Sequence, residues 1–145
     1  MTKGERLMAY QIRKVKYVHV TVPSRPGQAV RILKDLKDAK IDLMAFSGFP
    51  MAGRKSQVDL VAQNTPAIQR LAKSKGWKVS KVKKGFLVQG SDEMGAVLKV
   101  LSRLAEKDIN VTAADAVAAG KGRYGMIMWV NPQKYNSAAR LLNAK

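Results

Sequence analysis

The sequence predicts an α+β fold of two similar units in tandem, each an antiparallel sheet with helices on one face. The first observation is an internal repeat, in which segments 20–49 and 88–117 share a strand–loop–helix–strand plan. At this offset Gly27 aligns with Gly95 and Leu36 aligns with Leu104. The second observation is that period-2 alternation of apolar residues, typical of half-buried strands, frames helical segments with apolar residues three and four apart.

Each element of the first unit has its own signal. Val18, Val20 and Val22 alternate with polar residues and predict a strand. The Pro/Gly loop that follows leads into a helix whose expected buried stripe is Ala29, Val30, Leu33 and Leu36. Thr65 and Pro66 predict a second helix, as a capping hydroxyl and a proline at the first helical position. The expected order is strand 17–22, helix to 39, strands 41–49 and 57–63, helix 65–76 and strand 77–82.

The second unit repeats this order but stops before a fourth strand. Its expected elements are strand 86–89, a helix carrying Leu98, Leu101 and Leu104, strands 109–118 and 126–130, and a helix after Asn131 and Pro132. We expect the extension 10–16, or the other unit, to cover the open edge, since a bare edge strand promotes aggregation. Apolar residues on both faces of 126–130 indicate that its second face is also covered.

This order, β-α-β-β-α-β, is that of the ferredoxin-like split motif. We therefore expect tandem ferredoxin-like βαββαβ units: a first domain at 12–83, a truncated second domain at 84–145 whose fourth strand is absent or supplied elsewhere, and a flexible leader at 1–11.

Composition limits the compartment and the partners. The chain has 145 residues, no cysteine and no apolar run long enough to span a membrane, which together suit a cytoplasmic protein. The basic N-terminal segment lacks the apolar stretch of a secretory signal. A net charge of +17, spread along the chain, attracts polyanions, so binding of RNA or DNA is the alternative to the function suggested below.

The two strand–loop–helix–strand segments resemble the ACT domain family, as two tandem copies covering about residues 12–145. The loop Ser24-Arg25-Pro26-Gly27 keeps the Pro-Gly of the family's Asp-x-Pro-Gly-like loop but lacks its acid. The loop Asp92-Glu93-Met94-Gly95 keeps the acid and the glycine but lacks the proline. At the entry to the second strand, Ile109-Asn110-Val111 matches the family's pattern well, and Ile41-Asp42-Leu43 matches it less closely.

The resemblance implies a regulatory protein that binds a small ligand, commonly an amino acid, between paired ACT units, and hence a homo-oligomer such as a dimer. The loop before each helix suits an α-carboxylate, because the first helical N–H groups lack partners. The candidate ligand residues are Asp92, Glu93, Met94, Gly95 and Asn110 in the second unit, which is the favoured site, and Ser24, Arg25, Gly27 and Asp42 in the first. An equal alternative is that Asp92 and Ser24 only cap helices.

Other motifs do not predict chemistry. The GxGxxG match at 120–125 leads into a strand, whereas a dinucleotide site requires a helix there. The segment 84–88 resembles the start of an RNA-recognition motif but lies on the wrong strand and lacks further stacking aromatics. His19 is the single histidine, and acids do not cluster, so we expect no catalytic residue, metal or cofactor. A purely structural subunit that has lost its ligand is a third possibility.

Overall fold

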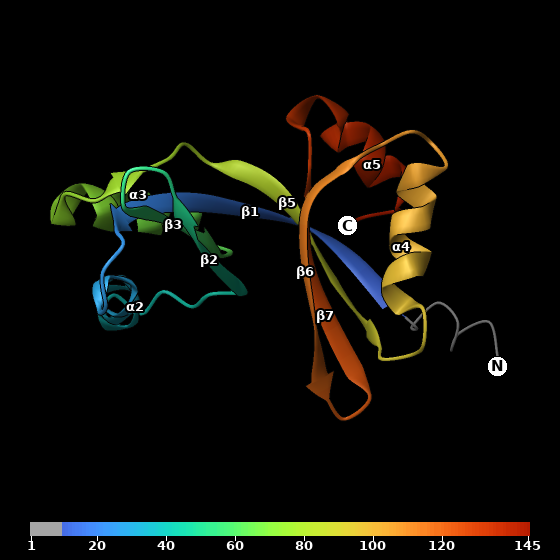
Figure 1. Cartoon of the computed structure of the whole chain (residues 1–145), viewed down its shortest axis with the longest axis horizontal. Helices are drawn as coiled ribbons and strands as arrows, with labels where there is room; N and C mark the ends of the chain where they lie inside the picture. The colour runs from blue at the N-terminus through green and yellow to red at the C-terminus, as the bar shows by residue number, and fades with distance from the viewer. Residues whose placement is uncertain (1–9) are drawn as a thin grey trace. The chain divides into compact units, whose positions relative to one another are not determined.

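The computed structural model describes residues 10–145 and confirms the α+β class, with antiparallel strand pairs and, in each unit, helices packed on one face of the sheet (Figure 1). The elements are β1 (Tyr10–Pro23), α2 (Gln28–Asp38), β2 (Ala45–Met51), β3 (Lys55–Val61), α3 (Thr65–Lys75), β4 (Lys78–Val79), β5 (Lys83–Ser91), α4 (Ala96–Ala105), β6 (Val111–Gly120), β7 (Arg123–Val130), the 3-10 helix η1 (Pro132–Lys134) and α5 (Tyr135–Leu141). Within residues 10–145 no helix is long and apolar enough to cross a membrane.

The chain forms two compact units, which we call the first unit (residues 16–83) and the second unit (residues 10–15 and 84–145). The boundary differs from the expected one, because residues 12–15 group with the second unit. The reason is packing: Ile12 is buried in the second unit's core, beside Phe86 and Leu142. Most of the expected leader 1–11 lies outside the described residues, but Tyr10 and Gln11 already belong to β1.

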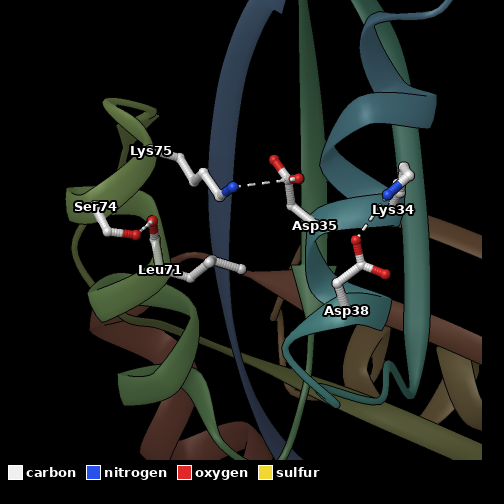
Figure 2. A network of polar contacts seen from close by, with 6 residues as sticks. All are labelled: Lys34, Asp35, Asp38, Leu71, Ser74 and Lys75. Atoms are coloured by element: carbon white, nitrogen blue, oxygen red, sulfur yellow. Dashed lines mark hydrogen bonds and ion pairs between the residues drawn. The ribbon is translucent and has the colours of Figure 1, made fainter.

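In the first unit the strands lie in the order β4-β1-β3-β2, and every pair is antiparallel. Both helices pack on one face of this sheet, where Leu36 of α2 and Ile68 of α3 join Val20 and Leu60 in the core. The helices are also linked by an ion pair, with 3.7 Å between Lys75 Nζ and Asp35 Oδ1 (Figure 2). The other face of the sheet carries neither of the unit's helices.

In the second unit the strand order is β1-β5-β7-β6, so the N-terminal part of β1 occupies the place that β4 has in the first unit. Lys145 extends this edge: its N–H donates to the Ile12 carbonyl at 3.0 Å, and the Lys14 N–H donates to the Lys145 carbonyl at 3.1 Å. The fourth strand of the second unit, which its own C-terminal segment lacks, is thus supplied by residues near the N-terminus.

The two units repeat one another down to single backbone positions. Val22 lies opposite Ser56 in the first unit, and their counterparts Gly90 and Tyr124 lie opposite one another in the second. The N-cap residues Gly27 and Gly95 both adopt left-handed conformations, with φ of 87° and 78°, which favour glycine.

Several local expectations differ from the structure. The strand expected at 41–49 begins only at Ala45, because Lys40 is left-handed and the Asp42 carboxylate accepts the Leu43 N–H, which turns the chain first. The cap of α3 is Asn64, whose side chain accepts the Ala67 N–H at 3.1 Å, and Thr65 is the first helical residue. On α2 the buried residues are Ile32 and Leu36, whereas Val30 is exposed. Both faces of β7 are buried, as expected.

Candidate functional site

A cleft of about 520 Å³ opens in the first unit where β1 ends and α2 begins. It is built from the end of β1, the following loop, the start of α2 and the facing parts of β2 and β3. Its lining residues are Val22, Pro23, Ser24, Arg25, Pro26, Gln28, Ala29, Phe46, Gly48, Phe49, Pro50, Ser56, Gln57 and Val58. Because all of them belong to the first unit, the cleft is a property of that unit alone.

The loop at the base of the cleft is fixed by backbone contacts. The Ser24 N–H donates to the Arg54 carbonyl at 2.9 Å, which ties the loop to the turn between β2 and β3. Gly27 then turns the chain into α2 with φ of 87°. No side chain caps α2, and its first turn carries no acidic residue. The partial positive charge of this helix start is therefore left for an anion, and Arg25 adds a full positive charge.

The walls of the cleft combine apolar and polar residues. Val22 and Val58 are core residues, and Phe46 contributes a half-exposed ring. This ring lies beside Gly48, where an added Cβ would be 3.8 Å from Phe46 Cε1. Ser56 provides a neutral hydroxyl, and no lining residue is acidic. The cleft thus offers one cationic end and one apolar end, which suits a small amphipathic anion.

The structure brings together part of the first unit's predicted set. Ser24 and Arg25 line the cleft, and Gly27 lies between the lining residues Pro26 and Gln28. Asp42 is elsewhere, in a separate hollow at the other end of α2, where its carboxylate accepts the Leu43 N–H at 3.0 Å. Asp42 therefore does not share a site with the other three.

The second unit's predicted residues are all exposed to solvent: Asp92, Glu93, Met94, Gly95 and Asn110. The Asp92 N–H donates to the Gly122 carbonyl at 2.8 Å, the counterpart of the contact between Ser24 and Arg54. The carboxylate of Glu93 is paired with Lys99. No side chain caps α4, so neither Asp92 here nor Ser24 in the first unit acts as a helix cap.

Tyr124 occupies the place in the second unit that corresponds to the cleft of the first. It is the counterpart of Ser56, which lines the first unit's cleft. The Tyr124 ring is 6% exposed and belongs to the second unit's core. Ala96 and Val97, the counterparts of Gln28 and Ala29, pack against the same cluster. The tyrosine ring therefore fills the space that is open beside Ser56.

Tyr124 was not among the candidate residues predicted from the sequence, although the internal repeat contained a signal for it. Residue 56 of the first unit aligns with residue 124 of the second, and that comparison sets a small hydroxyl against a large ring. Tyr124 Oη has no hydrogen-bond partner within residues 10–145. Burial, followed by Tyr10 and Glu93, raises the pKa of Tyr124.

The helix-free face of the first unit's sheet carries the titratable side chains of Tyr17, His19 and Asp59. His19 lies directly opposite Asp59 in the strand register. Burial, with a smaller effect of Lys83, lowers the pKa of His19, and Asp59 opposes that shift. Burial and Asp59 raise the pKa of Tyr17 to about 12. Across residues 10–145 no group of three or more His, Cys, Asp or Glu side chains is arranged to hold a metal ion.

The GxGxxG segment is the turn between β6 and β7, with Lys121 at φ of 55° and Gly122 at φ of 69°. It opens no helix, so it lacks the helix N-terminus on which a dinucleotide pyrophosphate binds.

No protein-family model and no curated protein matches this sequence. Solved structures do match its fold. Protein BT0572 from Bacteroides thetaiotaomicron is similar with a TM-score of 0.72 and 15% identity, over 89% of this chain and 88% of that one. The ligand-free regulatory subunit of aspartate kinase from Thermus thermophilus is similar with a TM-score of 0.60 and 12% identity, over 92% and 94%.

A structure of aspartokinase alpha and beta subunits is also similar, with a TM-score of 0.55 and 19% identity over 92% of this chain and 95% of that one. At these identities the likeness concerns the fold. The chain therefore shares the α+β architecture of aspartokinase regulatory subunits over nearly its whole length.

Proposed function

We propose that this protein is a non-catalytic regulatory protein that binds an amino acid or a related small carboxylate in the cleft of the first unit. The observation that carries the proposal is the uncapped start of α2, with Arg25 beside it, at the end of a cleft with an apolar wall. The fold shared with aspartokinase regulatory subunits supports a regulatory role. The sequence favoured the second unit, but Tyr124 fills the corresponding space there.

The cleft's chemistry defines the class of ligand. A carboxylate at the cationic end would accept hydrogen bonds from N–H groups of the first turn of α2 and an ion pair from Arg25. An apolar side chain would lie against Phe46 and Val58. Since no lining residue is acidic, an α-amino group would have to donate to neutral oxygens such as Ser56 Oγ.

A second copy of the chain would complete the site. Val30, Leu33 and Phe46 are 65%, 37% and 44% exposed on α2 and β2, the elements that border the cleft. Burial of such apolar groups favours association. A dimer that covers β2 would close the cleft, and a ligand that contacts both copies would shift the equilibrium toward that dimer. Sedimentation velocity with and without ligand would report this shift.

A thermal-shift screen with the twenty amino acids tests the binding site. A true ligand at about 100 times its Kd should stabilise the folded chain by about 2.7 kcal/mol, which raises the melting temperature by several degrees. Arg25→Gln should weaken the response at least about tenfold in ligand concentration, since it removes a charge-assisted contact. Arg31→Gln is the matched control, because Arg31 is exposed on α2 and does not line the cleft.

A second variant tests whether the ligand binds in this cleft or at another site. Ser56→Tyr introduces into the first unit the side chain that fills the second, and it should abolish the response to every amino acid. A screen without any stabilising amino acid, or an unchanged response in both Arg25→Gln and Ser56→Tyr, would refute the proposal.

A further inference from the structure

The helix-free face of the first unit's sheet carries a second candidate surface, at the end nearest the β2–β3 turn. Side chains alternate between the two faces along each strand. Since Val20, Val22 and Val58 lie in the core on the helix side, Thr21 and Gln57 project to the other side. The register extends this set into one row across four strands, which consists of Lys78, Thr21, Gln57 and Phe49. A second row, one step nearer the turn, consists of Pro23, Lys55 and Met51.

Positive charge converges on this surface from two separate segments. A hollow of about 340 Å³ is lined by Arg54 of the β2–β3 turn, by Lys55 at the start of β3 and by Lys78 of β4, together with Thr21, Val22, Pro23 and Gly53. Arg54, Lys55 and Lys78 are exposed, and within residues 10–145 none of them forms an ion pair with an acidic residue. Asp59, an acid on the same face, accepts the Gln57 Nε2–H at 2.9 Å.

Apolar groups lie next to these cations. Phe49 and Met51 are each 44% exposed on β2. Phe49 stands directly opposite Gln57, and Met51 stands directly opposite Lys55. An exposed aromatic ring on an open sheet, with cations on its flank, is the combination on which unstacked bases and their phosphates bind.

We propose that this face binds single-stranded nucleic acid, with Phe49 as a stacking platform and Arg54, Lys55 and Lys78 as phosphate contacts. The phosphates of a strand account for the cations, and an unpaired base accounts for the exposed ring, which a duplex would not use. Thr21 and the Gln57 carboxamide lie between them and supply hydrogen-bonding groups. The net charge of +17 adds long-range attraction for any polyanion.

The cations of this surface are separate from the amino-acid cleft, although Pro23, Phe49 and Gln57 also line that cleft. Lys55 and Lys78 do not line the cleft, and the helix start that forms its cationic end lies on the opposite face of the sheet. Neutralising Lys55 and Lys78 should therefore leave the thermal response to amino acids intact. Failure of one proposal would not imply failure of the other.

The experiment measures binding of a fluorescently labelled 20-nucleotide oligouridine to the full chain by fluorescence anisotropy, across a salt series. The wild type should bind at low salt and lose affinity steeply as salt rises. The variant Lys55→Gln/Lys78→Gln should bind at least about tenfold more weakly, and its salt slope should fall by about 1.4, from about 0.7 for each lost phosphate contact. Phe49→Leu should weaken binding by at least about fivefold while leaving the slope unchanged.

A matched control removes the same charge elsewhere. Arg31→Gln/Lys37→Gln also deletes two exposed cations from the first unit, but from α2 on the helix side. This control should weaken binding less than about threefold. Equal losses in the two double variants would overturn the proposal, because they would indicate only a diffuse field. Absence of binding at low salt would also overturn it, as would equal affinity for a duplex of the same length.

Discussion

The first and second units share the order of their elements but have different interiors, and this difference separates an open cleft from a filled core. At one strand position the first unit has Ser56, opposite Val22 and Pro50, and the second has Tyr124, opposite Gly90 and Ala118. The small neighbours in the second unit make room for the ring. Repetition of a fold unit therefore does not imply repetition of its site.

On the opposite face of the sheet, a second pair of facing residues also differs in size between the two units. In the first unit Tyr17 lies opposite Val61. In the second unit the counterparts are Gly85 and Trp129, and a Cβ added at Gly85 would lie 3.2 Å from Trp129 Nε1 and 3.3 Å from the Met128 carbonyl oxygen. Each unit thus pairs one large residue with one small residue, and the pairing is inverted between units.

The largest effect is expected from truncating Tyr124. Tyr124→Ala should lower the free energy of unfolding by about 3–5 kcal/mol, because it removes a buried ring and leaves a cavity. Tyr124→Phe is the control and should change that free energy by less than about 1 kcal/mol, because Tyr124 Oη has no hydrogen-bond partner within residues 10–145. Urea denaturation of both variants measures the difference, and similar losses in the two would show that the hydroxyl, not the ring, matters.

Gly85→Ala should lower the free energy of unfolding by about 1–3 kcal/mol, since the tight contacts of the new Cβ with the Trp129 indole and the Met128 carbonyl force these groups to shift. The double variant Gly85→Ala/Trp129→Val tests the size exchange, because Val61 is the first unit's counterpart of Trp129. If the contact with Trp129 is the cause, the cost of Gly85→Ala should shrink in the Trp129→Val background. An unchanged cost in that double-mutant cycle would contradict this account.

Arg103 and Asp35 occupy equivalent helix positions, and each contacts other elements of its own unit, but the two contacts differ in kind. The Arg103 guanidinium donates from Nη1 to Tyr10 Oη at 2.9 Å and from Nη2 to the Leu141 carbonyl, both partly buried. Arg103→Met should therefore cost about 1–2 kcal/mol. Asp35→Asn should cost less than about 1 kcal/mol, because its partner Lys75 is half-exposed. Equal costs in denaturant titrations would show that the two contacts are energetically equivalent.

His19 gives the first unit a dependence on pH that its counterpart Leu87 does not provide in the second unit. Because burial lowers the pKa of His19, the folded state favours the neutral ring. The resulting stability is complete above the unfolded pKa of about 6.5 and is lost as pH falls below it. The wild type should therefore lose more stability than His19→Gln between pH 7.5 and pH 5. Parallel pH profiles, measured by denaturation, would refute this assignment, and Lys83 and Asp59 are the neighbouring charges that also act on the pKa of His19.

Sequence periodicity predicted the order of elements, because the alternation in Val18, Val20 and Val22 and the glycines that begin the helices are local signals. It could not show which apolar residues of α2 are buried. Val30 and Ile32 are both apolar, and only the direction in which the helix packs decides that Ile32 is the core residue. The loops that contain Gly27 and Gly95 indicated the region of each unit in which the cleft of the first unit lies. The choice between the two units depended on Tyr124, whose effect is steric and appears only when β5, β6 and β7 are placed side by side.

The shared strand β1 has a consequence for how the chain acquires its fold. The edge of the second unit is formed by Ile12 and Lys14 together with Lys145, residues that are far apart in the sequence. Contacts of such long range form late and slowly, because a large loop must close first. During synthesis, residues 10–15 emerge early and stay unpaired until β5 has been made, and their contacts with Lys145 form only after that residue has been added. A chaperone that shields this short strand should therefore raise the yield of folded protein more than one that acts on the contiguous first unit.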